Sequence, residues 1–443
     1  MGGNRKMSRW LLALWLFAAI VFPLFAYIDP ATGSMLFSLL TGVAVTFFFF
    51  IKNVFLKVKY SFPFEIGIRK LSAFKRPLFV IYSEGKQYWN VFEPIIREFN
   101  VRGVPCVYYS SDEDDPGLLE SPAFIGSRFI GKGNRAYRFL NFLEADVCLM
   151  TTPGLDVLQV KRSPGVSHYA HILHAVTDAT LYRLFGLDYF DSVFLTGPYQ
   201  EKDIRYLEQL RGTPPKRLVV VGCTYLDVLT DKAKSLQVSP DGNTVLVAPS
   251  WGENGILRRF GMRLLRPLLE SEYRVIVRPH PQSMISEKSV IEQLQNELRG
   301  FSNIEWNFDR ENLDAMARSD VLISDFSGII FDYVFLFKRP VLYPKFEFDL
   351  RPYDAGDVPT EPWTFRTLRE IGHGFDEEDF PLIREIIMKG IRMNGKRAKR
   401  IEQVKKEAYL DPGSAGRRVV EELLKIGEEI QVAKKAAGIG RKK

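Results

Sequence analysis

Short apolar runs that alternate with helical patterns constrain the fold of this chain more than any other feature. Strands buried on both faces of a parallel sheet appear as continuous apolar runs, because helices cover both faces of such a sheet. The alternation therefore predicts an α/β protein with parallel sheets. The expected strands are residues 78–82, 104–109, 145–150, 192–195, 218–221, 245–248, 274–277, 304–306, 321–323 and 341–343.

A break in the alternation divides it into two units. Residues 232–242 include the turn sequence Ser239-Pro240-Asp241-Gly242, and strands followed by helices resume after it. We expect two Rossmann-like domains, with basic C-terminal helices and a tail after them. Ligands of doubly wound sheets bind at the carboxyl ends of the strands, which here line the cleft between the domains. The predicted ranges are 61–232, 233–380 and 381–443.

The first sixty residues have a different composition. Residues 10–28 and 35–51 carry no charge, and each stretch approaches the roughly 20 residues that span a bilayer. Because basic residues flank both outer ends, the positive-inside rule predicts a transmembrane hairpin over 1–60 with both ends in the cytoplasm. The expected location is the plasma membrane, as a multi-pass protein with cytoplasmic domains. A signal peptide cleaved near Ala26 is the alternative. The flanking residues are Arg5, Lys6, Arg9, Lys52, Lys57 and Lys59.

Charge and cysteine content exclude some classes of protein. The net charge is +7 over 443 residues, and the basic residues gather near the chain ends without interleaved aromatic residues. This distribution gives little support to nucleic-acid binding. Cys106, Cys148 and Cys223 are far apart and lie in or beside apolar runs, so we expect reduced, buried thiols.

Ser327-Gly328 is the most informative of the polar clusters that follow predicted strands. The strand at 321–323 ends in Ser324-Asp325-Phe326-Ser327-Gly328, and an apolar helical pattern follows. The first N–H groups of a helix lack partners and carry partial positive charge, which favours a phosphate there. The alternative is that Ser327 is only a helix N-cap. Asp325 either contacts the donor or orients this loop.

Two further clusters lie at neighbouring strand ends. Pro249-Ser250-Trp251 follows the first strand of the second unit. Arg278-Pro279-His280-Pro281 follows the next, and its two prolines fix an extended loop that suits Arg278 and His280 to hold a diphosphate. An ordinary ion pair of Arg278 is the alternative. Asp332, one helical turn beyond Gly328, either binds a ligand hydroxyl or pairs with Arg339.

Three histidines, His168, His171 and His174, lie close together in the sequence. On a helix they would share a face, but no acidic residue or thiol stands at ligand spacing, so we assign no metal to them. Histidine titrates near neutral pH, and one of the three is therefore a candidate general base.

Taken together, the clusters resemble the CDP-glycerol glycerophosphotransferase family of teichoic-acid primases and polymerases. The resemblance covers roughly residues 145–350. Its pieces, in chain order, are Leu173-His174-Ala175, Gly222-Cys223-Thr224-Tyr225-Leu226-Asp227, Ala248-Pro249-Ser250-Trp251, Arg278-Pro279-His280-Pro281 and Ser324-Asp325-Phe326-Ser327-Gly328 running on to Phe331-Asp332.

The resemblance implies a GT-B-like fold and transfer of a polyol phosphate from a CDP-polyol to an acceptor hydroxyl, with release of CMP. It implies CDP-glycerol or CDP-ribitol as donor, and a lipid-linked or envelope glycan of teichoic acid biosynthesis as acceptor. His174 would be the base and His280 a ligand of the donor phosphates. Donor phosphate contacts would come from Arg278, Ser324, Ser327 and Gly328, with Asp325, Pro249, Ser250, Trp251 and Asp332 near the nucleotide. No cofactor is implied, and the metal requirement stays open.

The chain departs from the family pattern on the acceptor side. Ala175 stands where the family has glycine, the family's lysine after the histidine is missing, and Thr224-Tyr225 replaces a Pro-Arg pair. Two other functions therefore stay open. One is a GT-B glycosyltransferase that uses a nucleotide sugar, and the other is a non-catalytic homologue that binds polyol phosphate.

Overall fold

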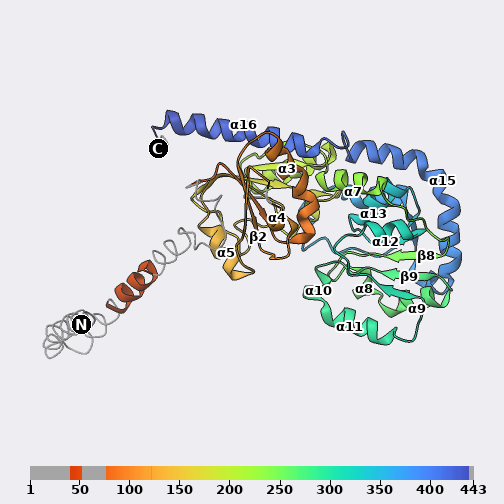
Figure 1. Ribbon diagram of the computed structural model, residues 1–443. Coiled ribbons are helices and arrows are strands. Elements are labelled where there is room, and N and C mark those ends of the chain that lie inside the picture. Colours follow the sequence, from red (N-terminus) through yellow and green to blue (C-terminus); the bar gives the residue numbers. More distant parts are fainter. Residues whose placement is uncertain (1–39, 52–75, 121, 439–443) are drawn as a thin grey trace, which may run out of the picture. The chain divides into compact units, whose positions relative to one another are not determined.

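The computed structural model describes residues 40–51, 76–120 and 122–438, and the chain divides into two compact units, Met1–Ile66 and Gly67–Lys443. In the first unit, residues 40–51 form a helix whose side chains are exposed. The second unit holds the strands and the remaining helices, which Figure 1 labels along the chain.

The predicted transmembrane hairpin, and the multi-pass membrane location drawn from it, need correction. No helix among the described residues is long and apolar enough to cross a membrane. The helix over 40–51 has twelve residues, about 18 Å at 1.5 Å per residue, against a hydrocarbon core of about 30 Å. The predicted span at 10–28, and the first part of the one at 35–51, lie outside the described residues.

A seven-stranded parallel sheet forms the first half of the second unit. Its strand order is β3-β2-β1-β4-β5-β6-β7, so the chain reverses direction across the sheet between β1 and β4. The strands are β1 Phe79–Ser83, β2 Cys106–Ser110, β3 Ile125–Phe129, β4 Ala145–Met150, β5 Val166–Ile172, β6 Ser192–Leu195 and β7 Arg217–Val220. The α-helices are α3 Trp89–Val101, α4 Pro116–Leu119, α5 Asn134–Asn141, α6 Glu201–Arg211 and α7 Thr224–Lys234.

A six-stranded parallel sheet forms the second half. Its order, β10-β9-β8-β11-β12-β13, is the Rossmann order, with the reversal between β8 and β11. The strands are β8 Thr244–Val247, β9 Arg274–Val277, β10 Ile304–Trp306, β11 Val321–Ile323, β12 Val341–Pro344 and β13 His373–Phe375. The α-helices are α8 Ile256–Arg259, α9 Met262–Glu270, α10 Ser283–Ser286, α11 Lys288–Glu297, α12 Leu313–Arg318, α13 Ile329–Phe337 and α14 Trp363–Ile371.

Helices cover both faces of each sheet, as the unbroken apolar runs predicted. In β1, Val80 and Tyr82 pack into the core on one face, while Phe79 and Ile81 pack into the core on the other. Successive strand residues point to opposite faces, so a fully apolar strand requires two cores. The predicted pair of doubly wound parallel sheets is therefore confirmed, while the predicted domain boundaries stay predictions.

The two C-terminal helices are α15 Ile383–Ala408 and α16 Ala415–Ala436. α15 packs against α13 and α14 of the second half, and α16 packs against α3 and β4 of the first. Figure 1 shows α16 running along the side of the first sheet that α3 also covers. Two glycines permit this close packing, because a Cβ at Gly416 would lie 2.8 Å from Pro94 and one at Gly427 would lie 2.8 Å from the Phe79 ring. The last segment of the chain thus completes the core beside the first sheet.

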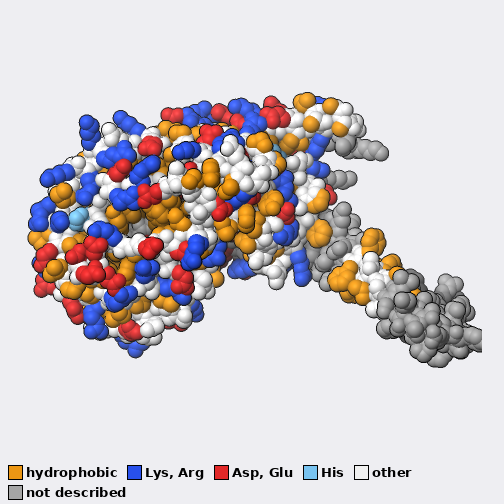
Figure 2. Space-filling view, turned by 180° about the vertical axis from the view of Figure 1, so that it is seen from behind, with side chains coloured by type: hydrophobic (Ala, Val, Ile, Leu, Met, Phe, Trp, Pro, Cys, Tyr) orange, Lys and Arg blue, Asp and Glu red, His pale blue; other side chains and the backbone are white. Residues whose placement is uncertain are grey.

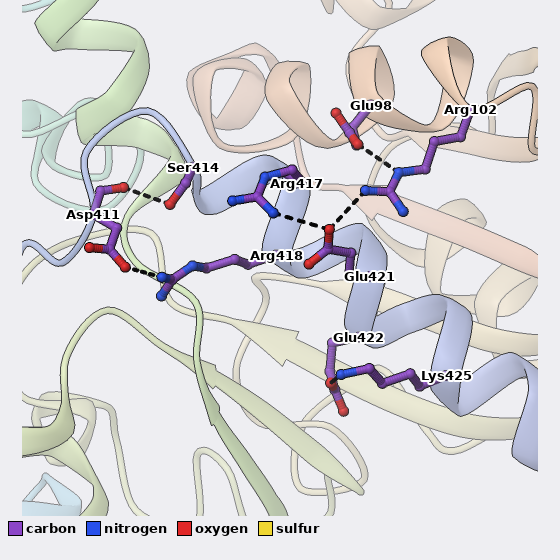
Figure 3. Close-up of polar contacts among 9 residues, drawn as sticks. All are labelled: Glu98, Arg102, Asp411, Ser414, Arg417, Arg418, Glu421, Glu422 and Lys425. Carbon is purple, nitrogen blue, oxygen red and sulfur yellow. Dashed lines mark hydrogen bonds and ion pairs between the residues drawn. The ribbon is translucent and has the colours of Figure 1, made fainter.

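Ion pairs join the exposed sides of α3 and α16. Figure 3 shows Arg102 at the end of α3 between Glu98 of the same helix and Glu421 of α16, at 2.6 and 3.0 Å. Arg417 reaches Glu421 from one helical turn away, at 3.2 Å. Such exposed pairs contribute at most about 1 kcal/mol each, so the apolar contacts dominate the attachment of α16.

Most of the basic residues of α15 lie on its outer side. Arg400 is an exception, because it pairs with Glu370 at 2.6 Å. Figure 2 shows lysine and arginine side chains gathered along the edge that this helix forms. An exposed run of this kind makes a solvated helix face. The exposed basic residues are Arg384, Lys389, Arg392, Lys396, Lys399 and Lys406.

Buried polar contacts fix the two halves of the second unit to each other. Asp354 accepts hydrogen bonds from the N–H groups of Phe185 and Gly186, at 2.7 and 3.1 Å, and pairs with Arg211 at 2.7 Å. The Asp178 carboxylate caps α14 by accepting from the N–H groups of Trp363 and Thr364, at 2.9 and 2.7 Å. These contacts hold the carboxyl edges of the two sheets in a fixed relation.

Candidate functional site

Both sheets place a topological switch point at their carboxyl edge. In the second sheet the switch point lies between β8 and β11, whose loops are 248–255 and 324–328. In the first it lies between β1 and β4, whose loops begin at Glu84 and Thr151. Ligands of open α/β sheets bind in the crevice at such points. Two of the three loops predicted on the donor side thus flank the switch point of the second sheet, and the third, which holds Arg278 and His280, follows the neighbouring strand β9.

Gly328 is where the two edges meet. A Cβ at Gly328 would lie 3.0 Å from the Cβ of Ala175 and 3.5 Å from the Cγ2 of Thr177, so the glycine lets the loop after β5 approach. Gly328 is also the N-cap residue of the nine-residue helix α13, and no side chain caps that helix end. Ser327 is therefore not the cap that the alternative interpretation proposed. Within the described residues, its hydroxyl has no hydrogen-bond partner in the protein.

The start of α13 is a favourable place for an anion. Its first internal bonds are those of the Ile330 and Phe331 N–H groups to Ser327 and Gly328. Among the described residues, the N–H groups of Gly328 and Ile329 have no acceptor in the protein. Free amides and the helix dipole both favour a phosphate at such a position. The Ser327 hydroxyl, half-buried beside them, supplies a further donor.

Asp325 organises the loops on both sides of the switch point. Its buried carboxylate accepts from the N–H of Ser250 at 2.9 Å and from that of Ile256 at 3.2 Å, both in the segment after β8. Within its own loop it accepts from Phe326 and Ser327, at 2.7 and 3.1 Å. Burial raises the pKa of Asp325, and the N–H groups oppose that shift. Of its two predicted roles, this geometry favours loop orientation.

Ser324 and Pro249 lie deeper than the sequence analysis expected. Ser324 is buried, and its hydroxyl donates to the carbonyl oxygen of Ala248 at 2.7 Å. It therefore joins β11 to β8 beneath the site, where a phosphate contact is not accessible to it. Pro249 is also buried, whereas Ser250 and Trp251 are half-exposed. The Arg183 guanidinium lies over the Trp251 indole, 5.7 Å from the ring centroid. This contact joins the loop after β8 to the first half of the second unit, where Arg183 lies.

Arg278 is committed to a neighbouring loop. Its guanidinium hydrogen-bonds the side chain of Asn307 and donates to the carbonyl oxygen of Asp309 at 2.7 Å. Burial lowers the pKa of Arg278, and its side chain is almost wholly enclosed. The guanidinium thus fixes the loop after β10 beside that of His280. The alternative of a simple ion pair with a carboxylate is not what the structure shows.

His280 has one ring nitrogen engaged and one free. Its Nδ1 accepts a hydrogen bond from the Gln282 N–H at 3.1 Å, which leaves the proton of the neutral ring on Nε2. Burial lowers the pKa of His280 to about 4, with further lowering by His174 and Arg278. At neutral pH the ring is therefore uncharged, and its Nε2–H can donate to a phosphate oxygen.

His174 directly precedes Ala175, the residue that Gly328 of the second sheet approaches, and its charge contributes to the lowered pKa of His280. Its Nδ1 is 3.0 Å from the Thr151 hydroxyl and 3.4 Å from that of Tyr182, and its ring meets that of Tyr88 edge-on at 5.4 Å. Burial lowers the pKa of His174 to about 4. The imidazole is thus neutral at pH 7. If Nδ1–H donates to Thr151, Nε2 is the free basic nitrogen.

Asp332 is buried between the two halves of the second unit. Its carboxyl lies near Asn312, to which the Tyr225 hydroxyl of α7 donates at 3.3 Å. Burial raises the pKa of Asp332 to about 7. Arg339 instead donates to backbone carbonyl oxygens, at 2.7 Å to that of Ala317, so the predicted alternative of an Asp332–Arg339 pair does not form.

The three clustered histidines do not all converge: His171 and His174 both contact the Tyr182 hydroxyl, whereas His168 lies elsewhere. β5 is a strand, which places His168 and His171 on opposite faces of the sheet. His168 lies 2.5 Å from the Ser192 hydroxyl, and His171 lies 3.2 Å from the Tyr182 hydroxyl. Among the three, only His174 follows the strand and enters the crevice.

Several residues of the crevice were not identified from the sequence. Glu84 follows the first predicted strand directly, so its position was a signal that could have been used. Thr151 follows a predicted strand in the same way. Tyr88 and Tyr182 gave no such signal, because neither follows a predicted strand. Tyr88 ends the short helical turn Lys86–Tyr88, and Tyr182 follows the short helical turn Ala179–Leu181.

The fold and the crevice define the class of protein. Two doubly wound sheets with their switch points turned to one crevice form a GT-B-like α/β protein. A model of the family described as CDP-Glycerol:Poly(glycerophosphate) glycerophosphotransferase matches residues 201–425, slightly more than half of the 443 residues. The chain belongs to this family, and it is a CDP-glycerol glycerophosphotransferase-like enzyme.

Solved structures support the fold. The wall teichoic acid polymerase TagF, soaked with CDPG, aligns with a TM-score of 0.54 at 15% identity, covering 86% of this chain and 96% of its own. A putative UDP-N-acetylglucosamine 2-epimerase from Listeria monocytogenes gives 0.52 at 12% identity, covering 80% and 97%. The UDP-GlcNAc 2-epimerase of Methanocaldococcus jannaschii, in complex with UDP-GlcNAc and UDP, gives 0.51 at 14%, covering 79% and 99%. No curated protein matches the sequence.

Proposed function

We propose that this enzyme transfers glycerol phosphate from CDP-glycerol to a hydroxyl of a lipid-linked or cell-surface glycan and releases CMP. The observation that carries the proposal is the shared crevice of His174, His280 and the start of α13. It brings a neutral base from one sheet to anion-binding groups of the other. Family membership supports CDP-glycerol as the donor, and CDP-ribitol is the related alternative.

The reaction follows from these groups. The Nε2 of His174 accepts the proton of the acceptor hydroxyl, whose oxygen attacks the phosphorus that bears glycerol. The bond from that phosphorus to the bridging oxygen breaks, and CMP departs with that oxygen. Phosphoryl transfer depends mainly on positioning and on stabilising charge on the phosphate oxygens. The N–H groups of Gly328 and Ile329, the Ser327 hydroxyl and the Nε2–H of His280 supply that stabilisation.

Release of CMP tests the proposal directly. Purified full-length protein is incubated with CDP-glycerol and a glycan acceptor preparation, and CMP is measured by chromatography, with and without EDTA and added Mg²⁺. We expect CMP release that requires protein and CDP-glycerol, and the chelator arms define the metal requirement. A folded protein that releases no CMP in any arm would contradict the proposal.

A panel of donors separates the proposal from the glycosyltransferase alternative. Because a ligand that binds only the folded state raises the melting temperature, CDP-glycerol, CDP-ribitol, UDP-sugars and GDP-sugars can be compared by thermal shift. We expect the CDP-polyols to give the largest shift. A larger shift with a UDP-sugar, together with its turnover, would favour the glycosyltransferase.

A further inference from the structure

Glu84 lies at the switch point of the first sheet, on the side of the crevice opposite the phosphate-binding groups. The strand register pairs Tyr82 with Met150 and Met150 with His171. Two residues further along, Glu84, Thr152 and Leu173 therefore leave three adjacent strands at the same level. His174 is the next residue. Adjacent strands are about 4.8 Å apart, which places Glu84 within side-chain reach of the region beside His174.

Two tyrosines that contact His174 also respond to the charge of Glu84. Tyr88 lies in the same loop as Glu84, four residues further along, and the charge of Glu84 contributes to the raised pKa values of Tyr88 and Tyr182. The same two tyrosines contact His174, at 5.4 Å between ring centroids for Tyr88 and at 3.4 Å from hydroxyl to Nδ1 for Tyr182. The loop that begins at Glu84 thus reaches His174 through Tyr88, and the Thr151 hydroxyl contacts the same imidazole at 3.0 Å.

No partner of opposite charge among the described residues accounts for the carboxyl group of Glu84. Burial raises the pKa of Glu84, opposed by the neighbouring Thr152 hydroxyl. Within residues 76–120 and 122–438, no lysine, arginine or histidine forms an ion pair with it. Burying an uncompensated carboxyl costs free energy, and such groups cluster at functional sites.

The chemistry of a carboxyl group narrows what can bind beside Glu84. A negative carboxylate repels phosphate, so the donor diphosphate belongs at the start of α13 and not here. A carboxyl group does bind hydroxyl groups well, because it accepts hydrogen bonds on two oxygens. An acceptor that carries a second hydroxyl beside the attacking one would place the attacking oxygen at His174 and the second at Glu84.

We infer that Glu84 is an acceptor-positioning residue that binds a hydroxyl adjacent to the attacking hydroxyl, so that the enzyme selects vicinal-diol acceptors. This inference rests on the proposed function and extends it to the chemistry of the acceptor end. The Thr152 hydroxyl is buried without a hydrogen-bond partner among the described residues, and in this arrangement it binds the acceptor beside Glu84. Glu84 transfers no proton in this arrangement, since His174 takes the proton of the attacking hydroxyl.

A comparison of two soluble acceptors tests the inference. Full-length protein is given saturating CDP-glycerol, and CMP release is measured against the concentration of glycerol or of propane-1,3-diol, which lacks the adjacent hydroxyl. For the wild type we expect kcat/KM to be about tenfold higher with glycerol. In Glu84→Gln the preference should fall to about threefold or less through the acceptor KM, while the KM for CDP-glycerol stays at the wild-type value.

Two further variants control for folding and for loss of charge. Glu144→Gln makes the same change at an exposed position of the first half and should keep the tenfold preference. Thr152→Val should reduce the preference by an intermediate factor. Melting temperatures of the variants show whether each is folded.

The possible outcomes separate the two proposals. If the wild type releases CMP but Glu84→Gln retains the full preference for glycerol, or if CMP release does not depend on either polyol, the assignment of Glu84 is wrong and the proposed function stands. A rise in the KM for CDP-glycerol would place Glu84 at the donor instead and would also overturn it. If folded wild-type protein releases no CMP at all, the proposed function fails and the assignment of Glu84 fails with it.

Discussion

The carboxyl edges of the two sheets share a topology but differ in chemistry. In each sheet the switch point is the place where the strand order reverses. It lies between β1 and β4 in the first sheet and between β8 and β11 in the second. The second edge presents mainly backbone N–H groups, held in place by Asp325 and Ser324. The first presents side chains, namely those of Glu84, Tyr88, Thr151, His174 and Tyr182.

Within the proposed function, this difference is the reason for placing the donor at the second edge and the acceptor at the first. Backbone amides cannot be titrated and are rigid, so they suit a phosphate whose charge is the same in every donor. Side chains can be exchanged without changing the fold, so they suit an acceptor that varies among related enzymes. The departures from the family pattern at Ala175 and at Thr224-Tyr225 lie toward the first sheet, in agreement with this division.

The largest expected effect tests whether His174 and His280 belong to one site. Because general base catalysis contributes about 10²- to 10⁴-fold, we expect His174→Ala to lower kcat by about 10³-fold. His280→Ala should also abolish most turnover, through loss of a phosphate contact. CMP release and melting temperature are measured for both, with His373→Ala in β13 as the control. Near-normal rates in both site variants would show that the assignment of the crevice is wrong.

The contact of Gly328 with Ala175 tests whether the two edges must fit closely. Because the added Cβ would lie 3.0 Å from that of Ala175, Gly328→Ala should lower turnover by about 10- to 100-fold. The double variant with Ala175→Gly removes the opposing methyl group and should recover much of the loss. Gly300→Ala is the matched control, because its Cβ would meet open space. If the double variant does not recover, the methyl group added at position 328 disturbs contact with the donor and not the fit between Gly328 and Ala175.

The pH dependence of turnover tests the electrostatics of the first edge. Burial lowers the pKa of His174 to about 4, so the imidazole remains an available base well below its ordinary pKa of 6.5. The logarithm of kcat/KM should therefore stay flat from pH 8 to about 5 and fall about tenfold per pH unit below about 4. An acid limb near 6.5 would show that the ring is solvated in the free enzyme.

A pair of serine variants tests the two roles assigned within the second edge. Ser327→Ala should lower turnover by about tenfold with little change in stability, because its hydroxyl has no partner among the described residues. Ser324→Ala leaves the Ala248 carbonyl without its partner, and it should lower the free energy of unfolding by about 1 to 3 kcal/mol. Activity per folded protein and urea unfolding are measured for both. If both variants lose the same activity per folded protein, the two serines do not have the different roles assigned to them.

The smallest effect concerns stability alone. The pKa of Asp332 is about 7 in the folded protein and 3.8 ordinarily, so the folded state holds a proton between those values that the unfolded state has lost. The contribution of Asp332 to the free energy of unfolding should therefore fall as pH rises from about 4 to about 7, by up to about 1.4 kcal/mol per pH unit. The lowered pKa values of His174 and His280 give the opposite slope in wild type and variant alike, so the Asp332 contribution is the difference between the two proteins. Asp332→Asn should remove that contribution, whereas Asp231→Asn at an exposed site should retain it. Urea unfolding at pH 5, 6, 7 and 8 measures the slopes, and parallel slopes in wild type and Asp332→Asn would contradict the prediction.

The fold was largely predictable from the sequence, and its exceptions have physical reasons. The strands at 145–150, 192–195, 274–277, 304–306 and 321–323 were predicted at their observed bounds. β3, β5 and β13 were missed, since all three mix polar with apolar residues and depend on neighbouring strands for burial. Residues 256–270 form two helices and not one, because Gly261 adopts a φ of +45° between α8 and α9.

The site was predictable in part. A polar cluster after an apolar strand marks a carboxyl edge, which identified Ser327, Gly328, His280 and His174. The inward or outward direction of each side chain was not predictable. Ser324 and Arg278 have the residue types of phosphate ligands, yet tertiary hydrogen bonds commit both to neighbouring loops.

By itself, the sequence determined the two parallel sheets, the loops at their carboxyl edges and the family, because apolar periodicity and motif order are local properties of the chain. Only the tertiary structure decided which loops flank a switch point, since strand order depends on pairing between distant segments. It also decided that Tyr88, in the loop after β1, contacts His174, in the loop after β5. The pKa values of both groups follow from burial, which packing creates and local sequence does not.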